Sequence, residues 1–175
     1  RTGSRFFQGP IRKMGLVSVK KALFNLIKKE KPYYQIHTHD RYLPRFTPEE
    51  MQKAYLQIAR LLLQNLNIQG LYRISWLLDP QLEKISPHLA HLRKIPEQNG
   101  AVFFRLGTFP MDRERAVRMS PLRKKLYEEG LYVPISYAYV WPREKIIQWS
   151  KNHPGWIHGS DIAPDFGKIP AIRYK

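Results

Sequence analysis

The strongest constraint on the fold of this sequence is a dipeptide that starts helices: Ser or Thr followed by proline. It occurs as Thr47-Pro48, Ser86-Pro87 and Ser120-Pro121. The hydroxyl can cap the first turn of a helix, and proline suits the first helical position because its missing N–H would have no partner there. Glu50 completes a capping box at the first of these points. The sequence therefore predicts a helix after each dipeptide.

Apolar residues at helical spacing follow each of these starts. The first helix is predicted to bury residues spaced three or four apart, which are Met51, Tyr55, Ile58, Leu62 and Leu66. The second is predicted to turn Leu89 and Leu92 inward. The third has Leu122 and Leu126 as its apolar positions and should end at Gly130. A further helix should begin at Pro142, with Ile146, Ile147 and Trp149 as its apolar residues.

Segments rich in aromatic and β-branched residues lie between these helices. They cover residues 32–39, 70–78, 101–106 and 133–141, and their alternation is typical of strands. In the second segment Tyr72, Ile74, Trp76 and Leu78 should share one face, with Arg73 and Ser75 on the other. In the last segment the shared face is strongly aromatic, with Ile135, Tyr137, Tyr139 and Trp141.

This alternation of helices and strands predicts an α/β fold with a central mixed sheet and flanking helices. The length of 175 residues suits one α/β domain. We place that domain at residues 32–151. A basic amphipathic N-terminal helix or arm would precede it at residues 1–31, and an irregular C-terminal tail rich in Gly and Pro would follow at residues 152–175.

The charge is strongly positive, with 30 Lys and Arg against 14 Asp and Glu and a net charge of +16. Residues 1–31 hold nine of these bases and a single acid, Glu30. Their apolar stripe could dock on the core as a surface helix, or the basic face could clamp nucleic acid or lie on anionic lipid. No apolar run approaches the ~20 residues that cross a bilayer. We expect a cytoplasmic protein with no transmembrane segment.

Several kinds of chemistry lack their residues in this sequence. Without cysteine there is no thiol nucleophile and no Cys-ligated metal. The glycine-rich nucleotide-binding loops and the GxSxG elbow of α/β-hydrolases are also missing from the sequence.

Histidine offers the clearest candidates for catalysis. His37 and His39 would project to one face of a strand, with Asp40 next to them, and His88 and His91 would share a helix face. Two such pairs could hold zinc, but no HExxH pattern accompanies them, and we expect no metal. His37 or His39 could instead act as a general base, because the pKa of histidine lies near working pH.

Aromatic residues interleaved with Lys and Arg could stack on nucleic-acid bases beside a basic groove. Aromatic residues that alternate along strands are more often packed in the core.

The segment from Gly70 to Trp141 resembles the C-terminal half of the GNAT superfamily of N-acyltransferases. The resemblance rests on the element order and on Leu126-Tyr127-Glu128-Glu129-Gly130-Leu131-Tyr132 before the last strand. It implies a GNAT-like fold with two central strands splayed in a V. It also implies that Tyr127 protonates a departing CoA thiolate, with His37, His39 or Asp79 as the base.

The resemblance departs from the family at the loop that binds the pyrophosphate of CoA. That stretch here runs from Leu82 to His88 and has no glycine. Lys84, Ser86 and His88 are the residues that would bind the cofactor there, at a helix N-terminus that directs amides toward an anion. Pro87 would remove one of those amides.

The sequence thus predicts an acyltransferase that moves an acyl group from acyl-CoA, or from an acidic acyl carrier protein, to an amine. The alternative is a nucleic-acid-binding protein without enzymatic activity, such as a ribonucleoprotein component, whose basic N-terminal arm contacts the phosphates.

Overall fold

The protein is seen here as a computed structural model, which describes residues 32–37 and 47–154. The expected basic helix in residues 1–31, His39 and the tail beyond residue 154 lie outside the described residues. In chain order the elements are β1 (Tyr34–Gln35), α2 (Pro48–Gln64), β2 (Gly70–Ser75), the 3₁₀ turn η3 (Trp76–Leu78), α3 (Leu82–Ile85), the 3₁₀ turn η4 (Pro87–Leu89), α4 (His91–Gln98), β3 (Val102–Gly107), α5 (Pro110–Arg118), α6 (Pro121–Glu128), β4 (Ser136–Pro142) and α7 (Arg143–Lys151).

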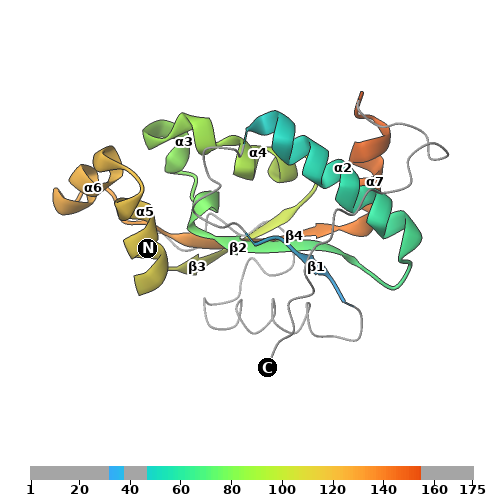
Figure 1. Ribbon diagram of the computed structural model, residues 1–175. Coiled ribbons are helices and arrows are strands. Elements are labelled where there is room, and N and C mark those ends of the chain that lie inside the picture. The colour runs from blue at the N-terminus through green and yellow to red at the C-terminus, as the bar shows by residue number, and fades with distance from the viewer. Residues whose placement is uncertain (1–31, 38–46, 155–175) are drawn as a thin grey trace, which may run out of the picture.

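The predicted α/β class is confirmed, with a four-stranded mixed sheet in the order β1-β2-β4-β3. β1 is parallel to β2, whereas β4 is antiparallel to both of its neighbours. Helices α2, α4 and α7 lie over one face of the sheet, and α5 and α6 lie beyond one end of it (Figure 1). In the described residues no helix has the length and apolar character to span a bilayer.

The main core lies between the sheet and the helices that cover it. α2 contributes Met51, Tyr55 and Leu62, and β4 contributes the predicted aromatic face of Tyr137, Tyr139 and Trp141. On the opposite face of the sheet, a smaller cluster joins Phe104, Leu106, Ala138 and Val140. β4 is therefore buried on both faces, which suits its central position in the sheet.

Two of the three predicted helix caps form with the hydroxyl as acceptor. The backbone N–H of Glu50 donates to Thr47 Oγ1 at 3.3 Å, and that of Arg123 donates to Ser120 Oγ at 3.3 Å. The half of the predicted capping box in which Thr47 accepts from Glu50 is thus present, and the Glu50 carboxylate pairs with Lys53 Nζ at 2.9 Å. At the third point, Ser86 caps nothing with its side chain, and a 3₁₀ turn precedes α4.

The predicted burial of α2 is wrong at one residue. Leu66 is 76% exposed, because the helix ends at Gln64 and the chain has already turned toward β2. In α6 the expected apolar position Leu122 is exposed and Arg123 is buried instead. Gly130 follows this helix with a φ of 71°, as its predicted role at the end requires.

In the segment from Gly70 to Leu78 the predicted faces hold only as far as the strand continues, and the main core covers the face opposite Tyr72 and Ile74. Leu71 and Arg73 are buried, whereas Ile74 is 43% exposed. Trp76 and Leu78 are also buried, because the backbone leaves the strand after Ser75 and coils into η3, where the alternation of faces no longer applies. Arg73 is held beside the hydroxyl of Tyr55, whose oxygen lies 3.4 Å from that of Tyr139.

Candidate phosphate-binding pocket

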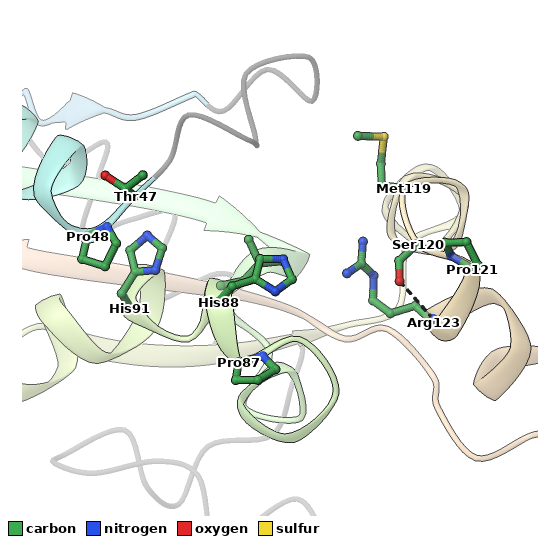
Figure 2. A pocket seen from close by; sticks show the side chains of 10 residues that line it. Thr47, Pro48, Pro87, His88, His91, Met119, Ser120, Pro121 and Arg123 are labelled. Carbon is green, nitrogen blue, oxygen red and sulfur yellow. Dashed lines mark hydrogen bonds between the residues drawn. The ribbon is translucent and has the colours of Figure 1, made fainter.

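A pocket of about 630 Å³ opens beside the helices, between three segments that lie far apart in the sequence. Thr47 and Pro48 come from the start of α2, and Met119, Ser120, Pro121 and Arg123 come from the start of α6. Pro87, His88, Leu89 and His91 complete the lining, from η4 and the start of α4. Figure 2 shows these three groups around the pocket, with His88 between His91 and the Arg123 side chain in that view. We call it the Arg123 pocket.

Arg123 is the most deeply buried polar residue among those that line this pocket. Its side chain is buried, with 3% of the residue exposed. Nε donates to the Ala116 carbonyl at 2.7 Å, Nη1 donates to Ser86 Oγ at 2.8 Å, and the guanidinium lies 5.1 Å from the centre of the Trp76 ring. Among the described residues no hydrogen bond uses Nη2. The guanidinium is thus fixed in direction and keeps one nitrogen for a ligand.

The electrostatics of Arg123 favour an anion. Burial lowers the pKa of its guanidinium, and the nearby Tyr132 opposes this effect. An arginine still carries its charge at neutral pH, and its planar fork matches the oxygens of a phosphate or carboxylate. The positive end of the α6 dipole lies in the same part of the pocket, since Ser120 and Pro121 line it.

An acid follows directly after the two residues of α2 that line the other end of the pocket, although it is not itself part of the lining. Glu49, at the start of α2, has a pKa below its usual range, because its own backbone amide and the Thr47 side chain donate hydrogen bonds to it. His91 contributes to the same effect. A carboxylate of the same chain therefore already accepts hydrogen bonds at the N-terminus of α2, which leaves Arg123 and His88 as the part of the pocket suited to an anion.

The structure places the predicted cofactor-binding residues unevenly. His88 is exposed and lines the pocket, and Ser86 is buried, outside the lining, where it accepts the hydrogen bond from Arg123 Nη1. Lys84 is exposed on α3 and is not part of the lining.

The predicted catalytic residues do not meet at this pocket. Tyr127 is half-buried on α6 and its ring lies 6.0 Å from the Arg113 guanidinium, while His37 is exposed just after β1. Asp79 is buried and accepts hydrogen bonds from the backbone N–H groups of Gln81 and Ile135 at 3.0 and 2.9 Å. Burial raises the pKa of this carboxyl above its usual range. None of the three lines the pocket.

The sequence analysis did not identify Arg123 as a candidate binding residue. A signal was present, because Arg123, Leu126 and Tyr127 have the spacing of one helix face. The apolar residues Leu122 and Leu126 instead led to the prediction that the neighbouring face of the helix is buried. In residues 32–37 and 47–154, no three His, Cys, Asp or Glu side chains gather in a way that could hold a metal ion.

Comparison with known proteins finds no family model, no curated protein and no solved structure that matches this chain. The fold and the pocket define it as a basic α/β-domain protein with a candidate anion site.

Proposed function

We propose that this protein binds nucleic acid and that the Arg123 pocket holds one of its phosphate groups. The observation that carries the proposal is the buried Arg123 guanidinium, held by Ala116 O and Ser86 Oγ with its remaining nitrogen at the pocket. Holding an arginine in place before binding reduces the side-chain entropy that is lost when a phosphate docks.

The distribution of charge supports a polyanionic ligand. The net charge of +16 attracts nucleic acid over long range, and residues 1–31 contribute nine bases against a single acid. Near the pocket, α5 and α6 add the exposed side chains of Arg113, Arg115, Arg118, Lys124 and Lys125. These exposed groups suit the phosphates of a backbone, whereas Arg123 suits a group that enters the pocket.

Fluorescence anisotropy with labelled single-stranded RNA and DNA of about 20 nucleotides tests the proposal at physiological salt. We expect Arg123→Gln to weaken binding at least tenfold, and His88→Ala to weaken it several-fold. Lys151→Gln is the control, because it removes an exposed positive charge on α7, away from the pocket. The proposal fails if the wild type binds neither nucleic acid, or if both pocket variants bind as the control does.

The salt dependence of binding tests the contribution of the N-terminal arm. In the full-length chain, Lys20, Lys21, Lys28 and Lys29 would be changed together to Gln. If all four neutralise phosphates, the slope of log affinity against log salt should become shallower by about 3 for a single strand. An unchanged slope would mean that these lysines do not contact the nucleic acid.

The second candidate is the acyltransferase that the GNAT resemblance implies. Two of the residues expected to hold CoA phosphates support it. Ser86 accepts a hydrogen bond from Arg123, and His88 lines the Arg123 pocket. Against it, β2 and β4 pair without a break from Gly70↔Pro142 to Ser75↔Tyr137, so these central strands do not splay.

Calorimetric titration with acetyl-CoA, a long-chain acyl-CoA and an acyl carrier protein tests this second candidate. Binding of one donor, and a loss of turnover of roughly 10²–10⁴-fold in Tyr127→Phe, would support it. Absence of binding for all three donors would exclude it.

A further inference from the structure

Resting on the proposed function, we infer that the Arg123 pocket recognises a terminal phosphate of a nucleic acid, a phosphomonoester, and not an internal phosphodiester. The first argument is depth. Arg123 is 3% exposed, and Pro48, Pro87 and Pro121, all exposed, line the same pocket. An internal phosphate is flanked by a sugar on each side. To reach Arg123, both sugars would have to fit between the rigid rings of the three prolines. A terminal phosphate projects from its last sugar and reaches the guanidinium.

The second argument is the acid that lies next to one end of the pocket, in the sequence position after its lining residues. Thr47, Pro48 and His91 lie on one side in Figure 2, and Ser120, Pro121 and Arg123 lie on the other. Glu49 follows Pro48 on α2, outside the lining, and hydrogen bonds lower the pKa of its carboxylate. A backbone that crossed the pocket would bring a second phosphate toward this acid. One phosphate bound at the Arg123 end avoids the repulsion.

The third argument is the charge of the ligand. A phosphomonoester carries about −1.5 to −2 at neutral pH, whereas a phosphodiester carries one negative charge. The Arg123 end of the pocket offers a fixed guanidinium, the N-terminal dipole of α6 and the imidazole of His88. This set gains more from the doubly charged group. Beyond the pocket, α5 and α6 carry further exposed bases that suit the phosphates following the terminal one.

The experiment compares three forms of one labelled 20-nucleotide RNA: with a 5′-phosphate, with a 3′-phosphate, and with hydroxyls at both ends. The full-length protein should bind at least one phosphorylated form tenfold or more tightly than the hydroxyl form, and the preferred end identifies the source of the phosphate. The preference should disappear in Arg123→Gln, shrink in His88→Ala and persist in Lys151→Gln. Should Arg123→Gln not fold, His88→Ala carries the test, because that residue is exposed.

The outcomes separate this inference from the proposed function. Equal binding of all three RNAs, with the same loss for each in the pocket variants, overturns the terminal-phosphate inference and leaves nucleic-acid binding in place. A preference that survives both pocket variants overturns the inference as well, because it places the terminal phosphate elsewhere. If none of the RNAs binds, both proposals fail.

Discussion

Arg123 Nη1 donates a 2.8 Å hydrogen bond to Ser86 Oγ, which ties α6 to the turn before η4 across 37 positions of the sequence. Both residues are buried. The bond joins two of the three segments that line the Arg123 pocket and points the guanidinium into it. It also explains why Ser86 does not cap the turn that it precedes: its oxygen serves as acceptor for a buried charge.

Loss of the Ser86 hydroxyl should therefore affect stability and binding together. Ser86→Ala leaves one end of a buried guanidinium without its acceptor, which should lower the free energy of unfolding by about 1–3 kcal/mol. Nucleic-acid affinity should also fall. Ser150→Ala is the matched control, since it removes a buried serine hydroxyl that donates to the Ile147 carbonyl at 2.8 Å on α7, outside the pocket lining. Urea unfolding and anisotropy measure the two effects, and equal affinities in both variants would contradict the role given to Ser86.

Two leucines of the α2 region provide a test of the core. Leu62→Ala should lower the free energy of unfolding by about 2–5 kcal/mol, because Leu62 is fully buried between α2 and the sheet. Leu66→Ala makes the same chemical change at an exposed position beyond the helix and should stay within about 0.5 kcal/mol of the wild type. Similar losses in the two variants, measured by urea denaturation, would mean that α2 buries a different face.

Asp79 should make stability depend on pH. Burial raises the pKa of its carboxyl above the ordinary value of 3.8, so the folded chain takes up a proton at a higher pH than the unfolded chain. Its favourable contribution is complete below pH 3.8 and is lost as the pH rises through the folded-state pKa. Asp79→Asn cannot titrate, so the wild type should lose stability relative to this variant as the pH is raised from 4 to 7. Urea unfolding at several pH values gives the free energy of unfolding of each protein. The prediction is refuted if the wild-type value minus the Asp79→Asn value stays constant or increases as the pH rises.

Tyr132 and Tyr139 should respond in opposite ways to loss of the hydroxyl. The Tyr132 oxygen is buried and has no hydrogen-bond partner among the described residues, and burial raises the pKa of this phenol. Tyr132→Phe should leave stability unchanged or raise it by about 1 kcal/mol. Tyr139→Phe removes the group that lies 3.4 Å from the Tyr55 oxygen and should lower stability by about 1 kcal/mol. Thermal unfolding distinguishes the two, and a marked loss in Tyr132→Phe would show that its hydroxyl has a partner.

Local chemistry determined much of the fold from the sequence alone. Thr47 and Ser120 cap their helices because a hydroxyl before a proline needs only the backbone of the next three residues to form the bond. The aromatic alternation of β4 predicted its core face for the same reason, since successive side chains of a strand point to opposite faces whatever surrounds them. These features and the alternation of elements were sufficient for the α/β class.

The sequence could not decide which face of an element is covered or which residues meet. Arg73 is buried and Ile74 is exposed, because the helices cover the face of β2 that holds Leu71. The Tyr55 hydroxyl lies on that side and forms a hydrogen bond with the Arg73 side chain. The Arg123 pocket brings together residues 47–48, 87–91 and 119–123, which are neighbours only after the sheet has formed and α2, α4 and α6 have docked around it. The helix and strand propensities of a segment depend on nearby residues and do not encode such long-range contacts. Tertiary packing alone therefore determined the site.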